Sequence, residues 1–153
     1  MAHTFQLTSP AFADGDTIPE RFTCEGENIS PALIIAGMPR GTASLALIVH
    51  DPDAPHGDFV HWLVGNIPTA IDRLLEGEPP DSAVQGTNDF GHEHYDGPCP
   101  PSGVHRYVFD LYALDAMLDL DDGAPEEDFR TAFADHAIAK TTLTGRFGAK
   151  ALA

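Results

Sequence analysis

Two histidines and an aspartate stand where predicted strands meet loops, and residues of these types can bind a small anion. Asp51 follows one apolar run, His61 lies near the start of the next, and His105 opens a third. A carboxylate next to an imidazole favours the protonated ring. A protonated histidine donates charge-assisted hydrogen bonds to phosphate or carboxylate groups. If these three residues meet in the fold, they form an anion pocket.

The segment that begins at His105 adds a phenol to this set. Because side chains alternate along a strand, His105 and Tyr107 share one face and Arg106 points to the other. Tyr107 can therefore face the same pocket as His105, whereas Arg106 is expected to be structural. Two roles stay open for Asp53: it caps its own turn, or it forms an ion pair with Arg106 behind the pocket.

A stiff loop precedes this segment. Residues 97–103 read Gly-Pro-Cys-Pro-Pro-Ser-Gly. Proline fixes φ and lacks an N–H, so this loop belongs neither to a helix nor to the interior of a sheet. The loop residues that can donate a backbone N–H to an anion are Gly97, Cys99, Ser102 and Gly103. The loop is predicted to form a rigid wall of the pocket.

Metal binding is an alternative for part of the same region. His92 and His94 form an H-x-H pair, Cys99 and His105 follow, and Zn²⁺ accepts imidazole and thiolate ligands. The spacing matches no structural zinc signature, and the H-x-H pair stands in a polar loop. Solvated loop histidines are the favoured interpretation. No metal and no cofactor are therefore predicted.

Catalysis is a second alternative. His105 together with Asp51 could act on water as a hydrolytic dyad, and Ser102 lies close to His105 in the sequence. A nucleophile needs an activating base within reach. The sequence contains neither a nucleophile elbow nor a glycine-rich phosphate loop followed by lysine. Non-catalytic binding is therefore the prediction.

The apolar runs that must position these residues are short and predict strands. They cover residues 5–8, 32–35, 44–49, 60–67, 107–114 and 141–147. One helix is expected to open at residues 124–127, where proline and two acids suit a helix N-terminus. Its predicted buried stripe consists of Phe129, Ala132, Phe133, His136 and Ala137. This balance predicts a single domain, residues 1–153, of mostly β antiparallel sandwich type.

Composition narrows the classes of partner and the compartment. A net charge of −16 repels nucleic acid and anionic membranes, and no apolar run approaches the ~20 residues of a membrane helix. The N-terminus lacks the features of a signal peptide, which predicts a cytoplasmic protein. Cys24 and Cys99 lie far apart in the sequence and are expected to be free thiols. The acidic surface disfavours close self-contact at low salt, although it leaves room for a homodimer.

Several segments, in a fixed order along the chain, carry a family resemblance. They are RFTCEG (21–26), SPAL (30–33), DPDAP (51–55), the stretch from Gly57 to the His61-Trp62 pair, GPCPPSGVHRYVF (97–109) and LTGRF (143–147). With these segments the chain resembles the phosphatidylethanolamine-binding proteins (PEBPs). The branch it resembles most is the prokaryotic one often called Raf kinase inhibitor-like.

This resemblance implies a fold and a pocket. The fold is a Greek-key β-sandwich with one or two small peripheral helices, and the pocket takes phosphate-like or carboxylate-like anions. The implied ligand-binding residues are Asp51, His61, Cys99, Pro100, Pro101, His105 and Tyr107. Structural neighbours of the pocket are expected to be Asp53, Pro55, Trp62 and Arg106, with Trp62 in the core and a cis peptide bond before Pro55. Since the family includes kinase and protease inhibitors, a regulated protein partner is a further expectation.

Overall fold

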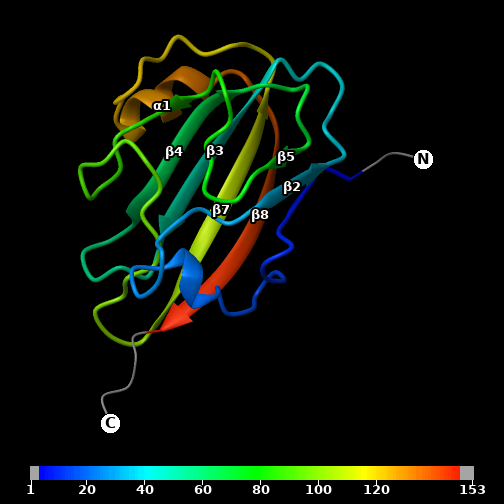
Figure 1. Cartoon of the computed structure of the whole chain (residues 1–153). Coiled ribbons are helices and arrows are strands. Elements are labelled where there is room, and N and C mark those ends of the chain that lie inside the picture. The colour runs from blue at the N-terminus through cyan, green and yellow to red at the C-terminus, as the bar shows by residue number, and fades with distance from the viewer. Residues whose placement is uncertain (1–3, 149–153) are drawn as a thin grey trace.

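The longest apolar runs of the sequence form the centre of a five-stranded antiparallel sheet (Figure 1). The computed structural model describes residues 4–148, and the strand order of this sheet is β6–β4–β3–β7–β8. The bounds are Val84–Gln85 for β6, Phe59–Ile67 for β4, Ser44–Asp51 for β3, Val104–Leu114 for β7 and Ala137–Gly148 for β8. After β4 the chain passes through the smaller sheet, returns as β6 at the edge beside β4, and then crosses to β7 on the far side of β3, which gives a Greek-key type of connection.

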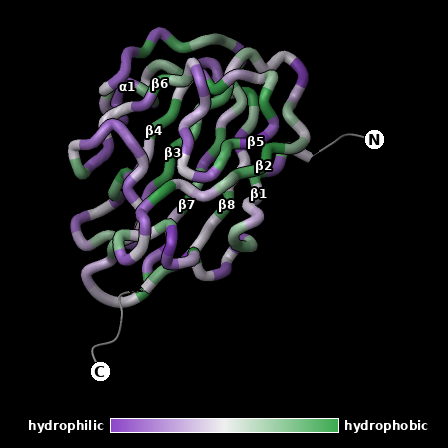
Figure 2. The backbone as a smooth tube through the Cα atoms, in the orientation of Figure 1, coloured by the Kyte–Doolittle hydropathy of each residue, from purple (hydrophilic) through white to green (hydrophobic). Residues whose placement is uncertain are grey.

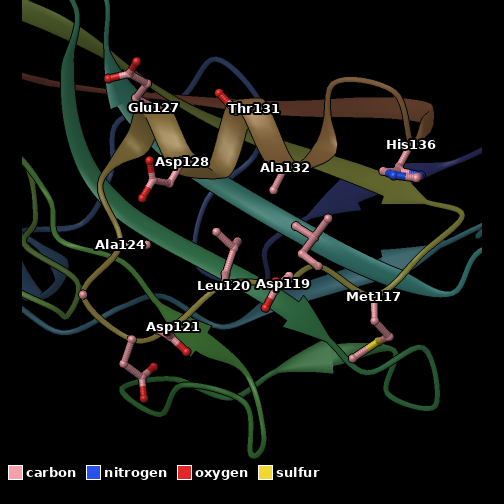
Figure 3. Close-up of a pocket in the computed structure, with 13 residues that line it drawn as sticks. Met117, Asp119, Leu120, Asp121, Ala124, Glu127, Asp128, Thr131, Ala132 and His136 are labelled. Atoms are coloured by element: carbon pink, nitrogen blue, oxygen red, sulfur yellow. The ribbon is translucent and has the colours of Figure 1, made fainter.

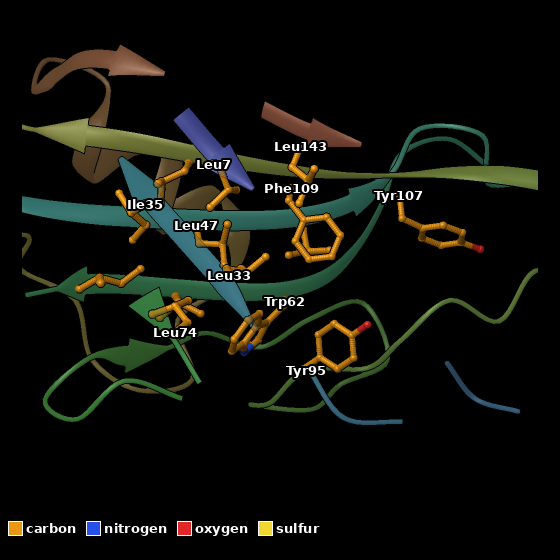
Figure 4. Packing of buried hydrophobic residues seen from close by; sticks show 14 of the residues in the cluster. Leu7, Leu33, Ile35, Leu47, Trp62, Leu74, Tyr95, Tyr107, Phe109 and Leu143 are labelled. Atoms are coloured by element: carbon orange, nitrogen blue, oxygen red, sulfur yellow. The ribbon is translucent and has the colours of Figure 1, made fainter. Parts of the chain in front are cut away.

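A second, smaller antiparallel sheet packs against the first. Its strand order is β1–β2–β5, with bounds Gln6–Thr8, Leu33–Ala36 and Arg73–Leu74. Leu7 lies opposite Ile35, and Leu33 lies opposite Leu74. Their side chains are buried with those of the large sheet, and Figure 4 shows this cluster around Leu47, Trp62 and Phe109. The predicted two-sheet, mostly β architecture is confirmed.

Strand β3 is buried on both faces, which explains its unbroken apolar sequence. Leu45, Leu47 and Val49 belong to the core between the sheets, whereas Ala46 and Ile48 belong to a second cluster on the opposite face. This alternation is the two-residue period of a strand. The second cluster is covered by helix α1 (Glu126–Phe133), which lies beside β4 in Figure 1.

Helix α1 spans Glu126–Phe133 and is shorter than the sequence pattern suggested. Three acids occupy its first turn, and Phe129 and Phe133 are buried. The prediction that His136 and Ala137 belong to the buried stripe is wrong, because the helix ends at Phe133. Ala137 is the exposed first residue of β8. His136 lies in the intervening turn, and its ring bonds to Asp115 instead of packing in the core. A 3₁₀ turn at Glu20–Phe22 is the second short helical element of the described range.

The connection from β6 to β7, residues 86–103, contains no helix or strand. Figure 2 shows that hydrophobic residues concentrate along the central strands, whereas hydrophilic residues dominate the connecting loops. This connection nevertheless carries buried residues, including Asn88, Tyr95 and Asp96, so it is an ordered part of the structure. Within residues 4–148, no helix is both long and apolar enough to span a membrane.

Candidate anion pocket

A cavity of about 210 Å³ opens where β3 ends and where β4 and β7 begin. Its lining includes all seven residues that were predicted to bind the ligand: Asp51, His61, Cys99, Pro100, Pro101, His105 and Tyr107. The other lining residues are Ala54, Pro55, Phe59 and Phe90. The fold therefore brings the predicted set together from four separate segments, while its role in binding stays a prediction.

Asp51 and His105 form a buried pair at the base of this cavity. Oδ2 of Asp51 lies 2.7 Å from Nδ1 of His105, and the two side chains are 5% and 10% exposed. Oδ1 of Asp51 accepts the backbone N–H of Asp53 at 2.8 Å, which fixes the carboxylate. Because Nδ1–H of His105 donates to Asp51, Nε2 is the ring nitrogen left for a ligand.

His61 is held in a similar way, but by a backbone oxygen. Its Nδ1–H donates to the carbonyl oxygen of Asp96 at 2.7 Å, so Nε2 is again the available atom. Burial lowers the pKa of His61 below its ordinary value of 6.5, and this effect outweighs the attraction of Asp96 and Asp51. His61 is therefore neutral at neutral pH, and an anion bound beside it would favour its protonated form.

Aromatic rings complete the wall between the two histidines. The ring of Tyr107 meets that of His61 edge-on, with centroids 5.3 Å apart, and lies 6.4 Å from that of His105. Burial, and then the nearby Asp51 carboxylate, raise the pKa of Tyr107, so its hydroxyl keeps its proton. The rings of Phe59 and Phe90 also meet that of His61 edge-on, with centroids 5.4 and 5.3 Å away.

Phe59 and Phe90 line the cavity but were not among the seven ligand-binding residues predicted from the sequence. A signal existed for Phe59, because it precedes His61 by two residues and strand alternation places both on one face. No such signal existed for Phe90, which stands in a loop without regular structure. Its position follows from the fold of the whole connection between β6 and β7.

Arg106 and Asp53 form an ion pair behind the pocket. Arg106 donates to both carboxylate oxygens of Asp53, from Nε at 2.9 Å and from a terminal nitrogen at 2.8 Å, and its backbone N–H adds a third bond. These bonds lower the pKa of Asp53 to about 2. The ion-pair role is thus the observed one, and the carboxylate that caps the turn is that of Asp51.

The two remaining structural neighbours differ in their placement. Trp62 is buried in the core as predicted, and its Nε1–H donates to Gln85 at 2.8 Å. Pro55 lines the cavity itself. The expected cis bond before Pro55 is wrong, since no cis peptide bond occurs in residues 4–148. The turn closes with the lower-energy trans isomer, through a 3.2 Å bond from the Gly57 N–H to the Ala54 carbonyl.

The prediction of two free thiols is also wrong, because Cys24 and Cys99 form a disulfide. The two cysteines are 75 residues apart in the sequence, but residues 22–28 pack against residues 95–99 and bring them together. The hydroxyl of Tyr95 donates to the carbonyl of Phe22 at 2.7 Å, and the N–H of Gly97 donates to Asn28 at 2.7 Å. A Cβ at Gly97 would overlap the Phe22 carbonyl, so only glycine allows this approach.

The disulfide changes two further interpretations. Cys99 has no thiolate to offer, so a zinc site formed by His92, His94, Cys99 and His105 cannot exist with the disulfide in place. His92 and His94 lie instead beside Asp96. With both cysteines in a disulfide, the cysteines do not indicate a reducing compartment, and the cytoplasmic location stays a prediction.

A larger cavity, of about 920 Å³, lies beside α1 and has the opposite electrostatic character. Figure 3 shows Asp119, Asp121, Glu127 and Asp128 around it, with Leu120 between them. Clustered carboxylates repel anions. The smaller histidine-lined cavity is therefore the candidate for an anionic ligand.

The chain is similar along nearly its whole length to proteins of one family. The sequence profile of that family, described as phosphatidylethanolamine-binding protein, matches residues 8–148. This chain therefore belongs to the phosphatidylethanolamine-binding protein family.

Individual relatives indicate the branch of the family. A UPF0098 protein from Methanothermobacter thermautotrophicus is 50% identical over 146 residues, which cover 92% of this chain and 97% of that protein. A crystal structure described as a putative PEBP homologue from Chlamydia trachomatis superposes with a TM-score of 0.92 at 41% identity, covering 96% of this chain and 99% of that one. The structure of YbcL from Escherichia coli, described as a new member of the mammalian PEBP family, gives 0.90 at 34% identity, covering 95% and 99%. The chain thus falls in the UPF0098 and YbcL-like prokaryotic branch.

Proposed function

We propose that this chain binds a small anionic or phosphorylated ligand, without catalysis, in the cavity lined by His61 and His105. The observation that carries the proposal is the pairing of each ring's Nδ1 with a protein oxygen, 2.7 Å away in both cases. Each ring is thereby oriented with Nε2 left for a ligand. A protonated ring donates to an oxyanion through Nε2–H, and the phenolic O–H of Tyr107 is a further donor beside it.

The size of the cavity limits the ligand to a small group. A volume of about 210 Å³ corresponds to roughly seven water molecules at ~30 Å³ each. A phosphate, a carboxylate or a phospholipid head group is of suitable size, whereas an acyl chain would have to remain outside. The net charge of −16 works against anions at long range, so we expect weak binding that tightens as salt screens this repulsion.

The first experiment is a titration with sulfate, phosphate, phosphoethanolamine and acetate, followed through the histidine ring protons by NMR. We expect saturable shifts at His61 and His105, and affinity losses in His61→Gln and His105→Gln. The matched control is His136→Gln, which removes a histidine beyond helix α1 that is bonded to Asp115. Equal affinities in all four proteins, or no shift at millimolar ligand, would contradict the proposal.

The pH dependence of sulfate binding is a sharper test, because the charge of sulfate is constant near neutrality. Burial lowers the pKa of His61 below 6.5. As the pH falls through that lowered pKa, His61 gains its charge and its Nε2–H becomes a donor to the sulfate. We expect sulfate affinity to rise below pH 6.5, and the rise to be reduced in His61→Gln.

Hydrolysis of a phosphoester is the second candidate, and the observation that favours it is the same Asp51–His105 pair. A carboxylate that orients an imidazole is the arrangement of a general base acting on water. Within residues 4–148, no serine, threonine or lysine that could serve as a nucleophile lines the cavity. Turnover of a phosphoester that is lost in His105→Gln would establish an enzyme, whereas binding without turnover supports the first proposal.

A further inference from the structure

Two exposed histidines and a buried aspartate form a compact cluster outside the pocket. Nδ1 of His92 lies 2.7 Å from Oδ2 of Asp96, and Nδ1 of His94 lies 3.9 Å from the same oxygen. The two imidazole rings stack with centroids 4.8 Å apart. One ligand atom from each of the three residues therefore lies within 4.8 Å of the others.

The aspartate of this cluster is fixed from behind. Nδ2 of Asn88 donates to Oδ2 of Asp96 at 2.8 Å, and both residues are buried. Oδ1 of Asn88 accepts the backbone N–H groups of Phe90 and His92, at 2.9 and 3.1 Å. One buried amide thus anchors the carboxylate and also shapes the loop that carries the first histidine. Such outer partners orient ligands at metal sites.

We propose that His92, His94 and Asp96 bind a divalent first-row metal ion of the zinc type. Two imidazoles and one carboxylate are ligands that Zn²⁺ and Co²⁺ accept. Bonds of about 2.1 Å in tetrahedral geometry place ligand atoms roughly 3.4 Å apart. The observed 2.7 and 3.9 Å separations lie on either side of that value, so side-chain rotations of the exposed histidines suffice.

The side chains that must move to bind the ion, those of His92 and His94, are exposed. His94 is 63% exposed and bonds through Nδ1 to the carbonyl of Tyr95 at 3.0 Å, a bond it would exchange for one to the ion. His92 is 51% exposed and would insert the ion into its bond with Asp96. Three protein ligands leave a position for water or a further ligand, as in catalytic zinc sites.

This cluster is separate from the anion pocket, but two residues, Asp96 and Phe90, contact both. The backbone carbonyl of Asp96 accepts the Nδ1–H of His61 at 2.7 Å. Phe90 stacks on His92 and contacts the ring of His61. An ion held by this cluster would therefore bind to the same loop that fixes the tautomer of His61.

The test uses the full chain without an affinity tag, in its disulfide form, so that neither tag histidines nor thiols compete. Zn²⁺ affinity is measured by competition with a chromophoric chelator, and Co²⁺ is added to record its visible absorption. We expect one metal equivalent per chain, and a loss of affinity of about tenfold or more in His92→Gln and in His94→Gln. Both substitutions are at exposed positions and should leave the fold intact.

Two matched controls isolate the proposed ligands. Glu93→Gln removes the negative charge of the residue that stands between the two histidines in the sequence. The side chain of Glu93 is directed toward Gly123, so it is not one of the proposed ligands. His136→Gln removes a histidine that is bonded to Asp115 elsewhere. Both controls should bind as the natural chain does. Absence of a saturable metal equivalent, or equal affinity in all five proteins, would overturn the proposal.

Discussion

The carboxylate of Asp51 stands directly behind His105, with Oδ2 2.7 Å from Nδ1. Asp51 is itself held by the N–H of Asp53, which belongs to the ion pair with Arg106. A chain of polar contacts therefore runs from the surface to the base of the cavity. Each link can be broken by one substitution.

Breaking the first link should weaken anion binding at neutral pH. In Asp51→Asn the ring of His105 loses the carboxylate that lies 2.7 Å from its Nδ1 and orients it, so Nε2 is no longer held in place for the ligand. We expect sulfate affinity to fall several-fold. NMR or calorimetric titration measures this, with Asp115→Asn as the control. Equal sulfate affinity in Asp51→Asn and in the natural chain would contradict this role of Asp51.

Breaking the ion pair should change the titration of Asp53. Hydrogen bonds from Arg106 lower the pKa of Asp53 to about 2, from an ordinary value of 3.8. The stability that this provides is present above pH 3.8 and is lost as the pH falls toward 2. In Arg106→Gln we expect the pKa of Asp53 to return toward 3.8, as followed by carboxyl ¹³C shifts. An unshifted Asp53, or the same shift in the control Arg130→Gln, would disprove this assignment.

His50 should make the stability of the protein depend on pH above 6.5. Its Nδ1 lies 2.6 Å from Asp58 and its Nε2 lies 2.8 Å from Asp110. Burial opposes the charge of this ring, but the two hydrogen bonds prevail and raise the pKa of His50 above 6.5. Because the folded state holds the proton more tightly, the stabilisation is complete below pH 6.5 and is lost as the pH rises through the raised pKa.

Urea unfolding of His50→Gln and of the natural chain, on both sides of pH 6.5, measures this effect. We expect the variant to be less stable by about 1–2 kcal/mol at the lower pH, with a smaller difference at the higher pH. The lowered pKa of His61 acts in the opposite direction, because its contribution is lost as the pH falls. His61 is present in both proteins, so its effect on stability cancels in the difference between them. A difference independent of pH would show that His50 is neutral in the fold.

The disulfide should contribute strongly to stability. Closing a loop of this length restricts the unfolded chain, which corresponds to about 4 kcal/mol in the chain-entropy account. We expect the double variant Cys24→Ser, Cys99→Ser to unfold at lower urea concentration. Thiol titration of the denatured natural chain should find no free thiol until a reductant is added. Two reactive thiols before reduction would contradict the bond.

The sequence predicted which residues line the cavity better than it predicted the contacts between them. Asp51, His61 and His105 were found because each stands at a strand end, where residue type and alternation are informative. The partner of His61 was not predictable, because the backbone of Asp96 has no signature of its own and reaches the ring through an irregular loop. The disulfide was missed for a related reason: sequence distance does not report that residues 22–28 pack on residues 95–99.

The fold was predicted where the hydrophobic period was clear. The unbroken run of β3 and the long strand β7 were recognised, whereas two-residue strands such as β6 carry too few residues for a period. The helix was extended too far, because His136 and Ala137 continue the helical spacing beyond the end of the helix at Phe133. Local pattern does not report where the chain turns to begin β8.

The bond between Cys24 and Cys99 turns the intervening chain into a covalently closed ring that contains β2 to β6. Asp51, His61 and Phe90 belong to this ring, whereas His105 and Tyr107 lie on the strand that follows it. A protease that cuts an exposed loop inside the ring would therefore release no fragment until the disulfide is reduced. The two halves of the cavity would stay tethered after such a cut, so a nicked molecule keeps every pocket residue in one covalent unit.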